Sequence, residues 1–221
     1  MSEAKYTPEQ QVQRAYEIHR IKNVMGRHAW FHCWRQHPKE YETIWSKRDD
    51  ISWGNSGGYH YGREAFYDCY VRNQAEGNET EPGVLFMHTL TTGLVELAED
   101  GQTAQGMWIT PGQAGGGDGT IQFMYERYAV DFILEDGEWK IWHLLVGTDF
   151  MLPMGGSLSD AKGPGGPPPG DRAPKPGVLP LKDYQSTDLG WPNYPQWPKP
   201  YKTFSETVSY GPESFLAKEA K

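Results

Sequence analysis

The chain has 221 residues, of which 37% are hydrophobic and 14% aromatic, which suffices for one domain with a hydrophobic core plus an extension. Its formal net charge of −8 argues against binding to nucleic acid or to an anionic membrane surface. The first residues are polar, and no segment approaches the run of about 18 apolar residues that a membrane span needs. The two cysteines provide no disulfide framework. We therefore expect a cytoplasmic protein.

The first half of the chain is predicted to be mainly helical. Thr7 followed by Pro8 is typical of a helix start. Apolar residues then recur at helical spacing as far as about residue 37, where Pro38 ends the helix. Beyond it we expect a helix, a strand, a returning strand and a third helix, over residues 39–46, 51–53, 59–61 and 63–72.

The second half is predicted to be a meander of long antiparallel strands. Asp100-Gly101 and Asp136-Gly137 are turn signals of two hairpins. The Gly-rich segment 111–119 is expected to be a loop between them. The strands are expected over residues 84–98, 102–110, 120–134 and 138–146. Helices followed by a meander indicate an α+β fold rather than a doubly wound sheet.

The composition changes after residue 151. Of the 17 prolines, all but Pro8, Pro38, Pro82 and Pro111 lie beyond it, which leaves 13. We therefore divide the chain into a folded domain, residues 1–151, and an extended Pro/Gly-rich arm, residues 152–221. The arm is expected to pack on the core or on a neighbouring subunit, because a disordered tail seldom carries so many rings: Trp191, Tyr194, Trp197, Tyr201 and Phe204.

Four features, in this order, carry a resemblance to a known family: Asp49-Asp50 before a strand, Tyr61–Ala65 opening a helix, Met87-His88 within a strand, and the closing hairpin Glu135–Ile141. Over about residues 10–150 the chain resembles the SnoaL-like branch of the nuclear transport factor two-like superfamily. The resemblance implies a curved antiparallel sheet wrapped round N-terminal helices, which forms a cone with a deep pocket. The arm has no counterpart in this pattern.

The resemblance also implies a function. Enzymes of this superfamily, among them ketosteroid isomerase, scytalone dehydratase and polyketide cyclases, mostly use acid–base chemistry in an apolar pocket without a cofactor. We therefore predict a cofactor-independent lyase, dehydratase or isomerase that acts on a hydrophobic, aromatic or polycyclic small molecule. One specific version is a deformylating lyase on lignin-derived diaryl compounds. The alternative is a non-catalytic module of the same fold that binds a small ligand or assembles subunits. In either case we expect a homo-oligomer, a dimer or a trimer.

His88 is the first candidate for acid–base catalysis. Strand alternation places it on one face with Phe86, and the resemblance implies that a histidine at this strand position moves the proton. The dehydratase pattern also pairs a Tyr or Lys on the first helix with an Asp five residues later, but His28 and Cys33 stand at those positions here. Either another acid orients His88, or the chemistry differs from that of the dehydratases.

The remaining candidates are histidines, phenols and aromatic residues. His28 is a further catalytic candidate, and Tyr61 and Tyr128 are candidate donors to an oxyanion; each could equally be a packed core residue. His28 and His32 lie four residues apart, but no third ligand is evident by spacing, so we predict no metal. The resemblance implies that no cofactor is needed. The candidate substrate-binding residues are Tyr59, Trp53, Phe86, His32, Arg127, His143 and Trp108.

Overall fold

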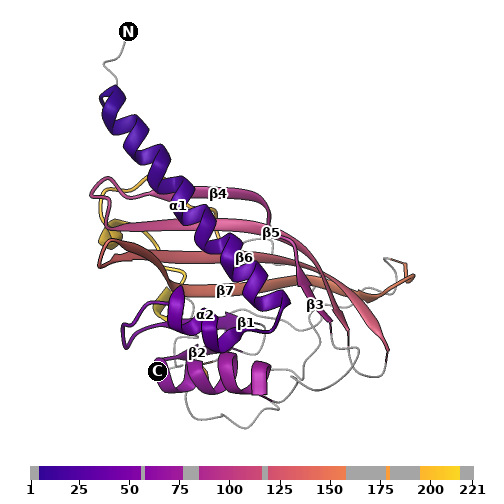
Figure 1. The fold of residues 1–221 in the computed structure, drawn as a ribbon. Helices are drawn as coiled ribbons and strands as arrows, with labels where there is room; N and C mark the ends of the chain where they lie inside the picture. The colour runs from indigo at the N-terminus through magenta and orange to yellow at the C-terminus, as the bar shows by residue number, and fades with distance from the viewer. Residues whose placement is uncertain are drawn as a thin grey trace, which may run out of the picture.

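The computed structural model describes residues 5–55, 58–76, 85–115, 119–157, 178–179 and 195–214. Helices from the first third of the chain lie against one face of a curved sheet, which we call the inner face (Figure 1). Within the described residues, no helix is long and apolar enough to cross a membrane.

Helix α1, Pro8–Cys33, crosses the inner face. Thr7 caps its start, because the Thr7 hydroxyl accepts from the Gln10 backbone N–H while the Gln10 side chain bonds back to Thr7. The helix ends at Cys33, earlier than the sequence predicts, and Arg35 turns the chain with φ of 59°. The buried positions form one face of the helix: Ile21, Val24, Met25, His28 and His32.

Short elements follow α1 and cover one end of the sheet. Helix α2, His37–Thr43, carries Pro38 in its first turn, so this proline opens the second helix. Strand β1, Ser52–Asn55, pairs antiparallel with β2, Gly58–Tyr61, and parallel with a long C-terminal strand. The predicted third helix consists of α3, Arg63–Phe66, and a π-helical run, η1, Tyr67–Glu76.

Within the described residues, the sheet has eight strands in the order β3-β5-β6-β7-β1-β2-β8, and β4 pairs with β5. Two hairpins form its centre, with turns at Asp100-Gly101 and Asp136-Gly137 as predicted. The remaining strands are β3 Leu85–His88, β4 Thr91–Leu97, β5 Thr103–Gly115, β6 Ile121–Glu135, β7 Glu138–Pro153 and β8 Val178–Leu179. The α+β cone fold that the sequence predicts is confirmed; the deep pocket stays a prediction.

Two predicted elements in the second half are wrong. The single strand expected over residues 84–98 is broken into β3 and β4 at Thr89 and Leu90, although both pieces keep one register with β5 as far as Thr91. The register then shifts within β4, where Thr92 takes a φ of 51°. The expected loop from Pro111 is strand as far as Gly115, because this end of β5 is held between β3 and β6. The Gly-rich composition of this segment therefore did not prevent it from pairing with β3 on one side and β6 on the other.

The long β6–β7 ladder contains two irregularities that alter which face a side chain occupies. Register shifts lie between Tyr125 and Glu126 and between Asp131 and Phe132. At each shift β7 carries one extra residue without a partner, Asp149 at the first and Trp142 at the second. Such bulges bend a strand and reverse the alternation of its side chains beyond the extra residue.

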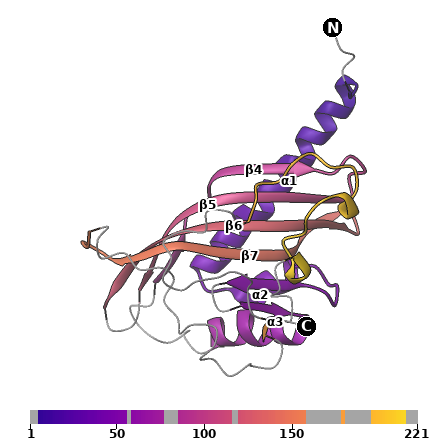
Figure 2. The ribbon, with the colours of Figure 1, turned by 180° about the vertical axis from the view of Figure 1, so that it is seen from behind.

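Residues 195–214, which we call the arm segment, lie on the outer face of the sheet, opposite α1 (Figure 2). The segment includes two short 3₁₀ helices, Phe204–Glu206 and Pro212–Ser214. Tyr201 and Tyr210 are buried against the sheet, and Phe204 packs its ring on Trp142 at 4.7 Å. Trp191 and Tyr194, which the sequence also assigned to a packed arm, lie outside the described residues. The division into domain and arm, like the homo-oligomer, stays a prediction.

Candidate active site

Four buried histidines gather between the helices and the inner face of the sheet, and we call them the inner histidine cluster. His28 and His32 project from one face of α1, His37 opens α2 and His88 ends β3. His32 is central: its ring centroid lies 4.8 Å from that of His88, 5.0 Å from that of His37 and 5.8 Å from that of His28. The i, i+4 spacing on α1 is what stacks His28 and His32.

His88 is paired with a carboxylate two strands away in the same sheet. Its Nδ1 lies 2.9 Å from Oε2 of Glu126 on β6, at ion-pair distance but not aligned for a hydrogen bond. The other Glu126 oxygen accepts from the Thr148 hydroxyl at 2.9 Å. Both His88 and Glu126 are buried. With Nδ1 turned to Glu126, the opposite ring nitrogen, Nε2, is left for a substrate.

His28 is paired with a second carboxylate. Its Nδ1 lies 2.6 Å from Oε1 of Glu40, and both side chains are buried. Glu40 also accepts from the Tyr70 hydroxyl at 3.0 Å and from Trp45 Nε1 at 3.0 Å. Several donors therefore hold this buried carboxylate, as a buried charge requires.

The electrostatics fix the protonation of the other members. Burial, together with the neighbouring His88 and His28, lowers the pKa of His32 well below its usual value. Burial also lowers the pKa of His37 to about 4. Conversely, burial raises the pKa of the Tyr70 and Tyr128 phenols well above their usual value. At neutral pH, His32 and His37 are therefore neutral, and both phenols keep the proton that a donor to an oxyanion needs.

Seven of the predicted site residues lie on the inner side of the sheet. Five form or border the histidine cluster: His28, His32 and His88 themselves, Phe86 with its ring 5.9 Å from His32, and Tyr128 with its ring 5.6 Å from His28 and 6.1 Å from His88. The other two are farther out. Trp53 packs on Tyr70 at 5.5 Å, and Trp108 packs on Phe132 at 6.1 Å beside its cross-strand neighbour Tyr128.

The structure places Tyr59 and Tyr61 away from the cluster. Tyr59 is fully buried, but its hydroxyl donates to the backbone oxygen of Tyr210 in the arm segment. Tyr61 is 39% exposed at the end of β2. Both stand on β2, which lies near the opposite edge of the sheet from β3, the strand that carries His88. Strand alternation therefore could not bring either phenol to His88.

Arg127 and His143 are also placed outside the cluster. Arg127 lies between Glu126 and Tyr128 on β6, so ordinary alternation turns it to the opposite face, whereas a bulge in β7 moves His143. Arg127 pairs with Asp149, the extra residue of the first bulge, with Nη2 to Oδ1 at 2.6 Å. The sequence puts His143 on the face of Ile141, yet Trp142 is the extra residue of the second bulge. The alternation reverses there, and His143 faces the arm segment.

Sequence reasoning missed both carboxylates of the inner cluster, and with them His37 and Tyr70. Glu126 shares strand parity with Tyr128, which was a candidate, so the same alternation could have found it. Glu40 stands in a short helix beside aromatic residues, and nothing local marks it as buried. Tyr70 depends on the π-helical winding of η1, which sequence periodicity does not reveal.

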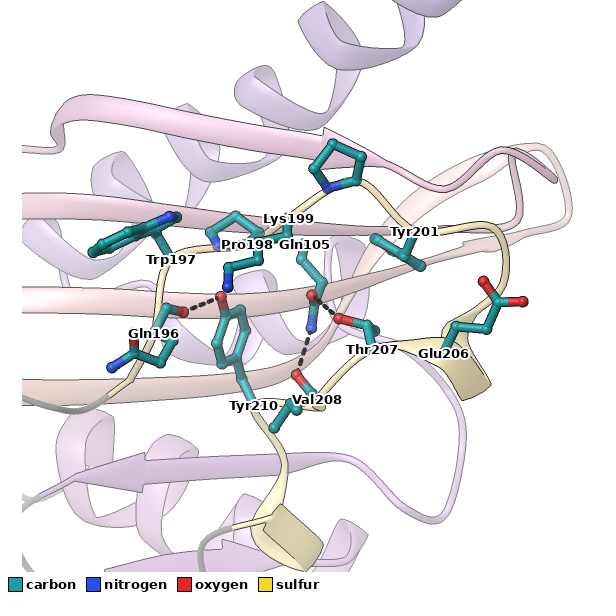
Figure 3. Close-up of a pocket in the computed structure, with 11 residues that line it drawn as sticks. Gln105, Gln196, Trp197, Pro198, Lys199, Tyr201, Glu206, Thr207, Val208 and Tyr210 are labelled. Atoms are coloured by element: carbon teal, nitrogen blue, oxygen red, sulfur yellow. Dashed lines mark hydrogen bonds between the residues drawn. The ribbon is translucent and has the colours of Figure 1, made fainter.

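A second group of polar residues lies on the outer face, and we call it the outer latch. Asp131, fully buried, accepts from Gln105 Nε2, Ser209 Oγ and the Tyr210 backbone N–H, each at 2.7 Å, and His143 Nδ1 lies 2.9 Å away. Gln105 also binds Thr207 and Val208, beside a groove of about 400 Å³ between the arm segment and the sheet (Figure 3).

The outer latch contains Ser, His and Asp but is not a catalytic triad. In a triad the acid and the serine bind opposite nitrogens of the imidazole ring. Here Ser209 Oγ and Asp131 Oδ2 both lie at His143 Nδ1, at 3.2 Å and 2.9 Å, while Nε2 faces the backbone oxygen of Asp50 at 3.1 Å. The acid and the serine therefore share one ring nitrogen, which is not the geometry of a triad.

Among the residues that the structure describes, no three His, Cys, Asp or Glu side chains are arranged to hold a metal ion. The two carboxylates of the inner cluster bind different histidines rather than converging on one point. The chemistry available to the cluster from its own side chains is therefore proton transfer at His28 and His88, with Tyr70 and Tyr128 as neutral donors.

A family model described as a SnoaL-like domain matches residues 13–144. Among the solved structures that share the fold is a protein provisionally named a scytalone dehydratase, from Novosphingobium aromaticivorans, with a TM-score of 0.54 and 12% identity over 64% of this chain and 90% of that one. A hexachlorocyclohexane dehydrochlorinase, LinA-type3, from Novosphingobium barchaimii has a TM-score of 0.54 and 17% identity over 66% of this chain and 96% of that one. A protein of unknown function, Rv3472, from Mycobacterium tuberculosis has a TM-score of 0.50 and 20% identity over 66% of this chain and 78% of that one. Comparison with the curated proteins gives no match.

Proposed function

The chain belongs to the SnoaL-like domain family, and we propose that it is a cofactor-independent lyase, dehydratase or isomerase acting on a hydrophobic small molecule. The observation that carries the proposal is the His88–Glu126 pair, whose facing atoms lie 2.9 Å apart in a buried site. Two of the structures that share its fold are named as a dehydratase and a dehydrochlorinase, which are enzymes that eliminate a group from a carbon skeleton. Both names fit chemistry that begins with removal of a proton from carbon.

In the proposed reaction, His88 Nε2 takes a proton from a carbon next to an electron-withdrawing group. Glu126 stabilises the imidazolium that forms, because an opposite charge within a few ångström favours the charged ring. The Tyr128 phenol, which keeps its proton, donates to the oxyanion that develops on the substrate. The surrounding rings of Phe86, Trp53 and Tyr70 suit a flat, aromatic or polycyclic substrate.

The rival function is a non-catalytic module that binds a small ligand or assembles subunits. A binding module needs no titratable groups at its ligand. Here Glu126, His32 and Tyr128 all contact His88, and His28 stands one ring away. This concentration of acid–base groups supports the enzyme over the module.

The test is substitution of His88 by Gln, with turnover followed by absorbance on phenolic, steroid-like and lignin-derived diaryl compounds. His88→Gln should lower turnover about 10²-fold or more, the range for a lost general base. Ligand binding should change far less, because proton transfer acts on the transition state. His143→Gln is the matched control, since it removes another buried, carboxylate-paired histidine on the other face of the sheet.

Near-normal turnover by His88→Gln would show that His88 is a core residue and would remove the proposal. Ligands that bind the wild-type protein without being converted would favour the non-catalytic module.

A further inference from the structure

The inner cluster holds two histidine–carboxylate pairs, and proton abstraction by His88 uses only one. The second pair, His28 with Glu40, has a shorter contact, 2.6 Å against 2.9 Å. Tyr70 donates to both Glu40 oxygens, at 3.0 Å and 3.1 Å. Holding an ionised carboxylate away from water in this way requires such partners, and the result is that one ring nitrogen of His28 is fixed towards Glu40.

The opposite nitrogen of His28 has no partner. Nε2 is buried and makes no hydrogen bond to any residue that the structure describes. An unsatisfied polar atom in a protein interior costs about 1–3 kcal/mol, and such an atom calls for an explanation, which an active site supplies. A ligand atom that approaches His28 would remove this cost by bonding to Nε2.

The two pairs share the same two neighbouring rings. The rings of His32 and Tyr128 each contact both His28 and His88. His32 is neutral at neutral pH because burial and its three histidine neighbours lower its pKa. His28 and His88 thus approach the same two neighbours, each with its own carboxylate behind it. This is the arrangement that a reaction needs when one group removes a proton and another supplies one.

Taking the proposed function as its basis, we propose that His28 is the general acid of the reaction, that Glu40 is its positioning residue, and that the substrate loses an oxygen leaving group. His88 Nε2 takes the proton from carbon, and the C–H electron pair forms the new C=C bond. The neighbouring C–O bond breaks, and the proton on His28 Nε2 passes to the departing oxygen, which leaves as water or an alcohol. His88 then releases its proton to solvent and His28 takes one up, so no net charge is gained.

The leaving group follows from the presence of an acid. Hydroxide and alkoxide are poor leaving groups and depart readily only when protonated, whereas chloride leaves without a proton. A site that eliminated only halide would need the His88–Glu126 pair and no second one. The His28–Glu40 pair therefore points to a β-hydroxy or β-alkoxy carbonyl compound with an aromatic group.

Two probes of one carbon skeleton separate the roles: a β-hydroxy-β-phenyl ketone and its β-chloro counterpart, both of which give the same conjugated enone, measured by absorbance above the uncatalysed rate. His28→Gln should slow elimination from the hydroxy ketone by about 10²-fold and leave the chloro ketone within a few-fold. Glu40→Gln should act in the same direction. Tyr70→Phe removes one donor to Glu40 and keeps the ring, so it should slow the hydroxy ketone more weakly. It replaces the other two variants if they do not fold.

A pH profile distinguishes positioning from a structural role. The groups that face His28 are Glu40 from α2, His32 from α1, Tyr70 from η1 and Tyr128 from β6. Because an acid must hold its proton, the wild-type rate on the hydroxy ketone should fall at high pH, and this alkaline limb should move to lower pH in Glu40→Gln. The chloro ketone should show no such limb.

The outcomes separate the two proposals. If His28→Gln slows both probes equally, or neither, His28 is not the acid, while the proposed function still stands on His88→Gln slowing both. If the wild-type protein converts neither probe, or His88→Gln converts both at the normal rate, the proposed function itself is wrong.

Discussion

The two faces of the sheet each carry histidines paired with carboxylates, and they differ in how completely their polar atoms are bonded. In the outer latch, Asp131 has four partners and both nitrogens of His143 face oxygen atoms. In the inner histidine cluster, His28 Nε2 and His37 Nδ1 are buried and have no hydrogen-bond partner among the described residues, and His88 Nδ1 and Glu126 Oε2 meet only as an ion pair at 2.9 Å. A fully bonded network stabilises a fold, whereas unpaired buried atoms mark a site prepared for another molecule.

This contrast predicts that the same kind of substitution has different consequences on the two faces. Changes in the outer latch should lower the free energy of unfolding and leave the chemistry of each folded molecule intact. Changes in the inner cluster should lower turnover, and the uncharged histidines there should make stability depend on pH.

The largest expected effect on stability is that of Asp131→Asn. Four donors point at the carboxylate, and an amide group would turn its own N–H donors against some of them. Breaking a buried charged network of this kind costs about 3–5 kcal/mol, which urea unfolding at neutral pH would measure. The matched control is Asp136→Asn in the exposed turn between β6 and β7, where φ is 50° and asparagine is well tolerated. A loss for Asp131→Asn no larger than that of the control would mean that the latch contributes nothing to stability.

The next effect is the loss of stability at acidic pH. The folded-state pKa of His37 is lowered from 6.5 to about 4, and that of His32 is lowered well below its usual value. Below pH 6.5 the unfolded chain therefore binds protons that the folded chain does not, so the free energy of unfolding falls as the pH falls. Each histidine contributes a slope of about 1.4 kcal/mol per pH unit, and for His37 this continues down to about pH 4.

Urea unfolding at a series of pH values from 7.5 downwards (roughly one point per half unit) measures this slope. His37→Gln should remove one histidine's share, whereas His19→Gln, at an exposed position on α1, should leave the slope unchanged. An unchanged slope in His37→Gln would assign the pH dependence to other groups.

The sequence predicts those parts of the contrast that depend on local signals. Thr7 and Pro8 start a helix, and Asp136-Gly137 closes a hairpin, because each signal acts within a few residues. The histidines of α1 are brought together by helical spacing in the same way. The inner cluster was therefore partly predictable from residues close in sequence.

The rest depends on contacts between distant residues or on bulges. His88 and Glu126 are brought together by the pairing of β3, β5 and β6, and no pattern near either residue specifies the other. The extra residues Trp142 and Asp149 leave the local sequence looking like an ordinary strand, yet they reverse the alternation. For this reason His143 was expected on the inner side and lies in the outer latch.

The last prediction compares the two faces with one small change, Gly→Ala, beside each histidine. A Cβ at Gly211 would lie 2.9 Å from His143 Nδ1, and one at Gly112 would lie 3.1 Å from His88 Nδ1 and 2.8 Å from the backbone oxygen of Met87. Each substitution forces a shift and should cost about 1–3 kcal/mol of stability. Gly211→Ala should leave turnover per folded molecule unchanged, whereas Gly112→Ala should lower it about 10-fold or more, because a base displaced by even 1 Å loses much of its effect.

Gly26→Ala is the control for both, since its Cβ would meet nothing within 4 Å on the exposed side of α1. Alanine at a helical glycine with room for its side chain should raise stability by about 0.5–1 kcal/mol. The contrast fails if Gly211→Ala lowers turnover as much as Gly112→Ala does, because the outer latch would then influence the reaction. The contrast is supported if Gly112→Ala and Gly211→Ala lose similar stability and only Gly112→Ala loses turnover. Strain of equal size would then affect the chemistry on one face of the sheet alone.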